Sequence, residues 1–489
     1  MDKKKLTKGI VHKKEEDFSE WYSEIVARAE LADLRYNIKG FVCYMPWAVI
    51  SIKRMYDLYE KALEKKGHLP LIMPSLIPES NFNLESDHVK GFTPQVFWVT
   101  EAGNGERMEE RLALRPTSET ALYKMYSMWI RSYNDLPFKR YQSCQVWRYE
   151  GKATRPFFRA REFHWIEAHN VFATLDEAKT QVIEDMQTTK EMLEDEFAMP
   201  FIFFERPQWD KFAGAINTYA ADALMDSGKV IQLPSTHLLG TNFSVPFDVK
   251  FTDKQGQEKF GFITCYGPAI SRIYGAMVAL LGDNQGLVLP FKLAPIQFVI
   301  VPIFYEENKT QVLEKCKEIE SKINKHYCVK VDENDSTTPG EKFNFWEMKG
   351  VPFRIEIGPK DIEKKQVVIV RRFDAKKFFV EEKGLLESIK ELAGSYTDEL
   401  KAKHFIKFDN MIKKCNSVSD VKKTIDSGKI ACAGFCSIGL DGAKCAEVIE
   451  KETGAEIRGS RVDREDNKFD KCVVCGKTAS KTIYIAKSY

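Results

Sequence analysis

The sequence predicts an α+β protein whose first and largest part is an antiparallel sheet with flanking helices. Between residues 18 and 290, strand-like runs are separated by long amphipathic helices, which is typical of a sheet backed by helices. Around residues 290–295 the pattern changes to alternating strands and helices, as in a small α/β domain. From about residue 384 the chain is helical and lysine-rich, and it ends in a cysteine cluster and a tyrosine-rich strand.

These changes divide the chain into four segments. We expect a disordered basic leader at residues 1–17, the sheet-and-helix domain at 18–290, the α/β domain at 291–383 and a small α/β C-terminal domain at 384–489. A chain of 489 residues is long enough for two to four domains with real cores.

Composition excludes several classes of protein. The net charge is only +2, so any nucleic-acid site must be a local patch. No apolar run approaches the roughly 18–20 residues that cross a bilayer, and the N-terminus lacks the apolar core of a secretory signal. The eleven cysteines are odd in number and mostly scattered. They indicate reduced thiols in the cytoplasm and one possible metal site, not a disulfide framework.

Helical periodicity predicts helices at residues 18–34 and 48–66, the second ending at Gly67, and a short strand follows. Residues 111–130 predict a strand, a turn at Pro116 and Thr117, and a helix.

Thr174 and Glu177 form a capping box for a helix to about Phe197. Residues 230–267 predict more strands, and an apolar helix opens at 267–272. In the α/β domain we expect one helix at 310–323 among four strands, QFVIVPIF, CVKVD, VPFRIEIG and QVVIVRR.

The most informative stretch is residues 146–169, VWRYEGKATRPFFRAREFHWIEAH. It reads as a strand with Arg148 and Glu150, a basic turn, and a second strand that runs from Phe157 to Glu167 and ends at His169. Strand alternation places six side chains on one face: Arg159, Arg161, Phe163, Trp165, Glu167 and His169. Guanidiniums, aromatic rings, a carboxylate and an imidazole together suit a pocket for a phosphate, a flat base and a small zwitterion. The alternative is an exposed hairpin with charge pairs.

Several strings together resemble one family. They are KGHLPLIMP (66–74), RPTSET (115–120), WRYE with RPFFRAREFHWIEAH (147–169), HLLGTNFS (237–244), GPAISR (267–272), GDNQGLVLP (282–290) and PGEKFNFWEMKGVPFRIEIGPKD (339–361). From about residue 18 to 489 the chain resembles the archaeal/eukaryote-like prolyl-tRNA synthetases, which are class II aminoacyl-tRNA synthetases. The resemblance implies a class II antiparallel catalytic sheet, an α/β anticodon-binding domain and a C-terminal domain of zinc-binding type.

The resemblance implies a proline–tRNA ligase. Such an enzyme activates L-proline with ATP and Mg²⁺ to prolyl-adenylate and transfers proline to the 3′-terminal adenosine of tRNA(Pro), with release of AMP and pyrophosphate. It also implies a homodimer without membrane attachment. The attacking carboxylate is already ionised at neutral pH, so the chemistry needs placement and charge neutralisation but no general base.

Matched positions imply the site residues. Arg148 and Arg272 would be catalytic. Proline would be bound by Thr117, Glu119, Arg148, Trp165, Glu167, His169, His237 and Cys265. ATP would be bound by Arg148, Glu150, Arg159, Phe163, Gln232, Ser235 and Arg272. Other roles remain open: Thr117 could cap the following helix, His169 and His237 could be satisfied core histidines, and Cys265 could serve packing.

Two further sites follow from the resemblance. Glu347, Arg354, Lys360 and Asp361 match positions that read the guanines of the proline anticodon, against the alternative of a charged loop face. Cys472 and Cys475 form a thiolate knuckle for a structural Zn²⁺. Cys436 and Cys445 would complete the site, with Cys432 as a competitor for Cys436 and buried reduced cysteines as the alternative. The resemblance also implies that the carboxylate of Tyr489 approaches the active site.

Two other functions stay open at this point. A class IIa ligase for threonine, glycine or histidine is one, although a threonine enzyme would be expected to carry zinc in its amino-acid pocket and the sequence shows no Cys/His triplet of that kind there. A synthetase-like protein that only binds tRNA or regulates is the other. The presence of both Arg148 and Arg272 argues against it.

Overall fold

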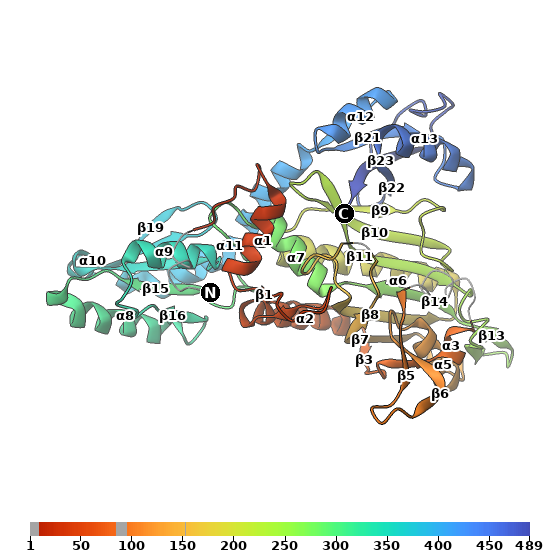
Figure 1. Cartoon of the computed structure of the whole chain (residues 1–489), viewed down its shortest axis with the longest axis horizontal. Helices are drawn as coiled ribbons and strands as arrows, with labels where there is room; N and C mark the ends of the chain where they lie inside the picture. The colour runs from red at the N-terminus through yellow and green to blue at the C-terminus, as the bar shows by residue number, and fades with distance from the viewer. Residues whose placement is uncertain (1–8, 85–94, 152) are drawn as a thin grey trace.

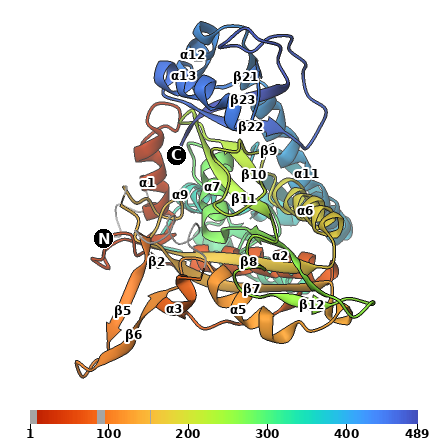
Figure 2. The ribbon, with the colours of Figure 1, turned by 90° about the vertical axis from the view of Figure 1, so that its right-hand side faces the viewer.

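The computed structural model describes residues 9–84, 95–151 and 153–489, and its centre is one eleven-stranded sheet (Figures 1 and 2). Most neighbouring strands are antiparallel, as predicted. In spatial order the strands are β20 (Ile412–Lys414), β21 (Ile430–Phe435), β23 (Lys481–Ser488), β22 (Glu456–Arg461), β9 (Ile202–Glu205), β10 (Asn217–Leu224), β11 (Lys229–Gly240), β14 (Phe262–Gly267), β8 (Glu162–Phe172), β7 (Phe138–Trp147) and β3 (Leu69–Pro70).

Six α-helices of this part lie within the described residues. They are α1 (Phe18–Arg28), α2 (Pro46–Lys65), α3 (Glu79–Phe82), α5 (Glu119–Trp129), α6 (Leu175–Lys190), which continues as a π-helix (Glu191–Glu196), and α7 (Ile270–Leu281). Every residue of α7 is buried except Arg272, which is partly buried. This apolar helix packs on β8 and α2, so it fixes Arg272 against the sheet.

Three small sheets complete the catalytic part. They pair β1 (Ala32–Asp33) with β2 (Cys43–Tyr44), β12 (Lys250–Thr252) with β13 (Glu258–Phe260), and β4 (Leu76–Pro78) with β6 (Arg107–Leu114) and β5 (Phe97–Glu101).

The predicted capping box at the start of α6 is confirmed. The Thr174 hydroxyl accepts from the Glu177 N–H at 3.3 Å, and the Glu177 carboxylate accepts from the Thr174 N–H at 3.0 Å. The first helix is shorter than expected, because the chain turns through a left-handed residue, Glu30 (φ 53°), soon after Arg28.

The second strand of the central hairpin begins later than predicted. β8 starts at Glu162 instead of Phe157, because Pro156 and the positive φ of Phe157 (65°) interrupt extended backbone. Arg159 therefore lies in the connecting loop, where it forms an isolated bridge with Arg155. The alternating face of β8 carries Phe163, Trp165, Glu167 and His169, but not the two arginines.

A five-stranded sheet forms the next domain. Its order is β16 (Val329–Val331), β15 (Phe298–Pro302), β17 (Phe353–Ile357), β18 (Gln366–Arg371) and β19 (Lys377–Glu381), with helices α8 (Lys309–Ile323), α9 (Pro339–Met348) and α10 (Pro359–Glu363). The four predicted strands and the helix at 310–323 are confirmed, and β19 is an additional strand.

This domain contacts the catalytic part at a tight turn, residues 283–286. Arg372 donates two hydrogen bonds to Asp283, at 2.8 and 2.6 Å. At Gly286 (φ 139°) a Cβ would lie 2.4 Å from the Met348 Cα, so only glycine allows the two backbones to approach this closely.

The C-terminal helices are α11 (Leu385–Asp409), α12 (Val418–Asp426) and α13 (Ala443–Thr453). The strands of this part extend the catalytic sheet, because β22 pairs antiparallel with β9. The last strand, β23, brings Tyr489 back toward the centre of the molecule (Figure 1).

The expected disordered leader needs correction. Residues 1–8 lie outside the described part of the chain. Residues 9–17 lie within it and pack against the rest of the protein. Lys14 is 8 % exposed, forms an ion pair with Asp226 at 2.7 Å and donates to the carbonyls of Leu280 and Gly282. These contacts hold the segment in place. Within the described residues, every helix is too short or too polar to span a bilayer.

Candidate active site

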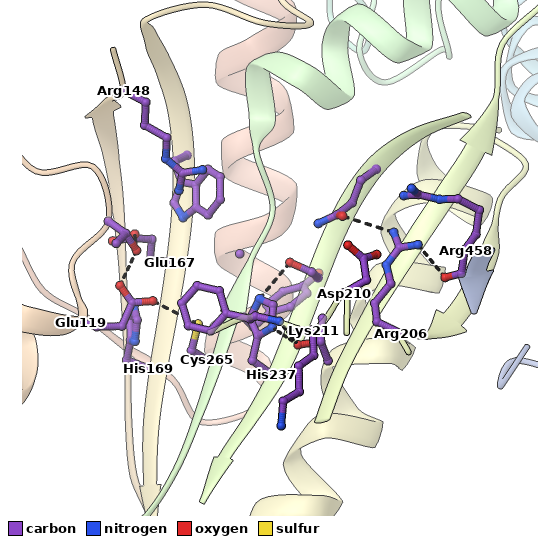
Figure 3. Close-up of a pocket in the computed structure, with 18 residues that line it drawn as sticks. Glu119, Arg148, Glu167, His169, Arg206, Asp210, Lys211, His237, Cys265 and Arg458 are labelled. Carbon is purple, nitrogen blue, oxygen red and sulfur yellow. Dashed lines mark hydrogen bonds between the residues drawn. The ribbon is translucent and has the colours of Figure 1, made fainter. Parts of the chain in front are cut away.

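A cavity of about 290 Å³ opens above the middle of the large sheet. Its walls come from the loop before α5, strands β8, β10, β11 and β14, and residues 206–212 after β9 (Figure 3). All eight residues expected to bind proline line it: Thr117, Glu119, Arg148, Trp165, Glu167, His169, His237 and Cys265. Gln232 and Ser235, two of the expected ATP ligands, line it as well.

Two buried carboxylates form one end of the cavity. Glu119 and Glu167 are 1 % and 2 % exposed. The Thr117 hydroxyl contacts Glu119 and lies 3.1 Å from Glu167, which also accepts from Gln142 at 3.2 Å. Ser118, not Thr117, is the N-cap of α5. Thr117 therefore spaces two acids instead of capping the helix, and the site is suited to a cation.

The two histidines differ in their surroundings. His237 has both ring nitrogens in hydrogen bonds, to Thr218 at 3.0 Å and to Ser235 at 3.2 Å, and burial lowers its pKa to about 4. His169 uses Nδ1 with the Tyr123 hydroxyl at 2.9 Å, while its Nε2 has no partner among the described residues. His237 is therefore uncharged, and both of its ring nitrogens are hydrogen-bonded, so it can only form a wall of the cavity. His169 can offer one ring nitrogen to a bound molecule.

Cys265 lies beside the acids. Its sulfur is 3.7 Å from a Glu119 oxygen, and burial, followed by the charges of Glu119 and Glu167, raises the thiol pKa well above its ordinary value. Glu119, His169 and Cys265 offer ligand atoms that all lie within 4.8 Å of one another. The sequence shows no Cys/His triplet in this part, but the fold assembles a mixed Glu/His/Cys group.

Arg148 borders the acidic end. Its guanidinium lies 5.4 Å from the Phe163 ring centre and 5.3 Å from that of Trp165, and its Nε donates to the Pro116 carbonyl at 2.9 Å. These contacts hold the group at the mouth of the cavity.

The other expected ATP ligands, Glu150, Arg159, Phe163 and Arg272, lie outside this cavity's lining. Arg159 is 3.6 Å from Glu150, and Arg272 donates to the Phe158 carbonyl at 3.2 Å. Burial, and then the charges of Arg148 and Arg159, lower the pKa of Arg272 to about 10. The hairpin region at residues 148–159 and helix α7 therefore bring the guanidiniums of Arg148, Arg159 and Arg272 within electrostatic range of one another.

Tyr489 closes this region from the C-terminal side. Its ring stacks on Phe158 at 4.9 Å, and its backbone oxygen accepts from Arg159 at 2.9 Å. Its hydroxyl contacts Arg155. The last strand thus delivers an aromatic residue to the arginine cluster.

One wall of the cavity was not predicted from the sequence. It is lined by Arg206, Asp210, Lys211, Phe212, Thr218 and Arg458. The charged, aromatic run ERPQWDKF at 205–212 was the available signal for most of these residues. Arg458 gave no signal, because it comes from β22.

A buried ionic network supports that wall. The Asp222 carboxylate accepts hydrogen bonds from Arg206 at 2.5 Å and from Arg458 at 2.7 Å. Arg206 also donates to the Gln232 side chain at 3.2 Å. Burial alone would raise the pKa of Asp222, but the two arginines hold it below its usual value.

The four anticodon candidates lie at two places in their domain. Arg354 donates to Glu347 at 2.6 Å and to Glu356 at 3.0 and 2.9 Å. Asp361 accepts from the Gly358 N–H at 3.0 Å at the start of α10, next to Lys360. Asp361 therefore has a local capping contact.

The four predicted zinc ligands come together. The sulfurs of Cys436, Cys445, Cys472 and Cys475 lie within 4.8 Å of one another, with Cys436 and Cys445 at 3.7 Å. Cys432 is buried in β21 and packs in a different apolar cluster. Of the two competitors, the cluster contains Cys436.

Three family models match consecutive parts of the chain. The "tRNA synthetase class II core domain (G, H, P, S and T)" matches residues 97–280, the "Anticodon binding domain" matches 297–392, and "Prolyl-tRNA synthetase, C-terminal" matches 418–489. The proline–tRNA ligase of Thermofilum pendens is 47% identical over 98% of this chain and 99% of that protein. The Methanopyrus kandleri enzyme is 38% identical over 97% and 96%.

Solved structures agree with this match. Giardia lamblia prolyl-tRNA synthetase, in complex with prolyl-adenylate, aligns with a TM-score of 0.95 and 35% identity over 99% of this chain and all of that one. The Cryptosporidium parvum enzyme, complexed with halofuginone and AMPPNP, aligns with a TM-score of 0.93 and 32% identity over 98% of this chain and 99% of that one. The chain belongs to the prolyl-tRNA synthetases of archaeal/eukaryotic type, a family of class II proline–tRNA ligases.

Proposed function

We propose that the cavity activates L-proline with ATP to prolyl-adenylate and that the chain then transfers proline to the 3′-terminal adenosine of tRNA(Pro), releasing pyrophosphate and AMP. One observation carries this proposal. Arg148 interacts electrostatically with two unlike sets of groups: the acids Glu119, Glu167 and Glu150, and the guanidinium of Arg272, which Arg159 also approaches. Such a polarity fits a zwitterion whose carboxylate meets a phosphate.

At the acidic end, the secondary ammonium of proline is neutralised by Glu119 and Glu167. Trp165 and His237 face the same cavity and provide flat, uncharged walls for the ring. Thr117, His169 and Cys265 complete the slot. Its small volume favours a compact amino acid.

At the basic end, Arg148 bridges the proline carboxylate and the α-phosphate of ATP. Arg159 holds the phosphate tail, and Phe163 and Arg272 sandwich adenine. Glu150, Gln232 and Ser235 make the remaining polar contacts, and Mg²⁺ accompanies the phosphates. Because the attacking carboxylate is already ionised, these residues act by placement and by neutralising charge.

For tRNA(Pro), we propose that Glu347, Arg354, Lys360 and Asp361 read anticodon guanines. Arginine pairs with guanine O6 and N7, and a carboxylate accepts from guanine N–H. The clasp of Arg354 between Glu347 and Glu356 must then rearrange when a base enters.

The four-cysteine cluster fits a structural zinc ion. Tetrahedral Zn–S bonds of about 2.3 Å place sulfurs about 3.8 Å apart, close to the spacing of this cluster. The ion would brace the C-terminal domain, since four thiolates leave no open position. Chelation should therefore lower thermal stability, and Cys475→Ser should remove one zinc per chain in metal analysis.

We also propose a cytoplasmic homodimer with domain boundaries at about residues 291 and 384. None of the eleven cysteines forms a disulfide, as in a reducing compartment. β3 is the last strand of the large sheet, and Leu69 and Ile72 beside it are 56 % and 94 % exposed. Such an apolar edge suits a second copy of the chain. Ile72→Glu should shift the molar mass measured by light scattering toward that of a monomer.

Amino-acid-dependent ATP–pyrophosphate exchange tests the function. Proline alone should support exchange in a panel that includes threonine, glycine, histidine, alanine and cysteine. Exchange with threonine instead would indicate another class II ligase. Binding of tRNA without exchange for any amino acid would indicate a synthetase-like binding protein.

A further inference from the structure

We infer that the amino-acid end of the cavity has a second occupant: a thiophilic divalent cation such as Zn²⁺, bound by Glu119, His169 and Cys265 in competition with proline. This site is separate from the four-cysteine cluster and lies in the catalytic sheet. The inference rests on the proposed function, because it places the cation where the proline ammonium and ring would bind.

The donor atoms already converge. The carboxylate comes from the start of α5, the imidazole from β8 and the sulfur from β14, and all three ligand atoms lie within 4.8 Å of one another (Figure 3). Bonds of 2.0–2.3 Å to a tetrahedral zinc would place such atoms about 3.5 Å apart. Small side-chain rotations would shorten the present separations, which are at most 4.8 Å, to about 3.5 Å. The Cys265 sulfur is already 3.7 Å from a Glu119 oxygen.

His169 provides the independent observation. The residue is 1 % exposed, and its Nε2 has no hydrogen-bond partner among the described residues. A buried ring nitrogen without a partner is costly and calls for a ligand. The Tyr123 hydroxyl, 2.9 Å from Nδ1, fixes the ring in the way that an outer partner orients a metal-binding histidine.

The charge of the site favours a cation. Glu119 and Glu167 are both buried, the Thr117 hydroxyl contacts both, and Arg148 supplies one positive charge for the two acids. Proline supplies one positive charge when it binds. In its absence a dication meets the same need, and it gains a nitrogen and a sulfur donor that suit zinc better than magnesium.

The fourth position stays open. Among residues of the lining, His237 has both ring nitrogens occupied by Thr218 and Ser235. A water molecule would complete the tetrahedron, so the ion would be exchangeable, unlike one enclosed by four thiolates. Free zinc should therefore act as a reversible inhibitor at the proline end.

Metal counting on the full-length protein tests the inference. The purified chain, with zinc in its four-cysteine cluster, is dialysed against buffered free Zn²⁺ and analysed for metal. We expect two ions per chain, which fall to one when L-proline is added, and no change with L-valine. Cys265→Ser should bind one ion, and the control Cys43→Ser, which removes an exposed thiol outside the cavity, should bind two.

Kinetics give a second readout. When free zinc equals the dissociation constant of the second ion, the apparent KM for proline should rise about twofold with kcat unchanged, by simple mass action. A single ion in excess zinc, a second ion that proline does not displace, or unchanged stoichiometry in Cys265→Ser would overturn the inference. If that variant fails to fold, displacement by proline in the wild type decides alone.

The two proposals can fail separately. If pyrophosphate exchange requires a different amino acid, that amino acid should displace the second ion, and the metal site stands while the substrate changes. If proline supports exchange but only one ion binds, the function stands and the metal site does not.

Discussion

Two groups of arginines, one in the wall of the cavity and one at and beside it, differ in their partners. Arg206 and Arg458 share one buried carboxylate, Asp222, at 2.5 and 2.7 Å. Arg272 instead has Arg148 and Arg159 as its strongest charged neighbours, and burial together with these two charges lowers its pKa to about 10, although Glu150 acts in the other direction. The first group is held in buried ion pairs within the fold, whereas at Arg272 burial and two like charges outweigh the one nearby carboxylate. The difference indicates which arginines support the wall and which meet a phosphate.

The largest expected effect comes from breaking the neutralised group. Arg458→Met leaves Asp222 with one buried partner fewer, and removal of one member of a buried pair costs about 3–5 kcal/mol. We expect a loss of that size in the free energy of unfolding measured with urea. Arg464→Met is the matched control, because its ion pair with Asp409 is more than half exposed.

A loss in Arg458→Met no larger than in Arg464→Met would show that the network adds no stability. Arg206 and Arg458 could then no longer be distinguished from the other arginines by a role in stability.

Mutating the second group should affect activity more than stability. Arg148→Ala should lower proline-dependent pyrophosphate exchange on the order of 10² or more, as for loss of a preorganised charge at a transition state. Arg272→Met should also lose exchange but unfold at a urea concentration no lower than wild type, because its surroundings disfavour the charge. Arg35→Ala, which removes an exposed arginine far out on the surface, serves as the control.

If Arg272→Met lost stability and kept its exchange rate, the arginine would belong with the structural group, and the proposed clamp on ATP would be wrong.

Much of the fold and the acidic end of the site could be predicted from local pattern. The Thr174 capping box, the apolar helix with its single arginine and the period-two face of β8 are each encoded within about 20 residues. The start of β8 was predicted too early, because the apolar residues after Pro156 imitate a strand while Phe157 takes a left-handed conformation.

The missing wall of the cavity could not be predicted in this way. Arg458 reaches Asp222 only because β22 joins β9, a pairing between residues about 250 positions apart. No local pattern encodes such a contact. The Nε2 of His169, which has no partner among the described residues, is similar, since its surroundings depend on how α5, β8 and β14 pack around the ring.

A smaller effect is expected at the contact that closes the basic end. Deleting Tyr489 removes the ring stacked on Phe158 and the oxygen that accepts from Arg159. Arg159 must then be ordered by ATP itself, so we expect the KM for ATP to rise about tenfold, which corresponds to about 1.4 kcal/mol. Tyr489→Phe keeps ring and backbone and should stay near wild type. Equal KM values for the deletion and wild type would separate Tyr489 from the nucleotide site.

The smallest effect concerns a buried carboxylate with neutral partners. Asp185 accepts from Gln181 and Thr236, both at 2.7 Å, and burial raises its pKa to about 7. The folded state therefore keeps a proton that the unfolded chain releases near pH 4, so stability falls as pH rises from about 4 to 7. Asp185→Asn should flatten this part of the urea-midpoint profile. Parallel profiles for variant and wild type would contradict the assignment.

Asp222 sharpens the contrast, because its folded pKa lies below the ordinary value. The stabilisation of the folded state by ionised Asp222 is present above the pKa of the unfolded chain. It is lost as pH falls through the folded pKa, which is the opposite direction to Asp185. Wild type and Arg458→Met should therefore converge in stability in acid, where protonated Asp222 no longer attracts the arginines, while wild type and Asp185→Asn should differ most in slope between pH 4 and 7. Two buried carboxylates, Asp185 on α6 and Asp222 on β10, thus give opposite pH dependence, decided by whether arginines accompany them.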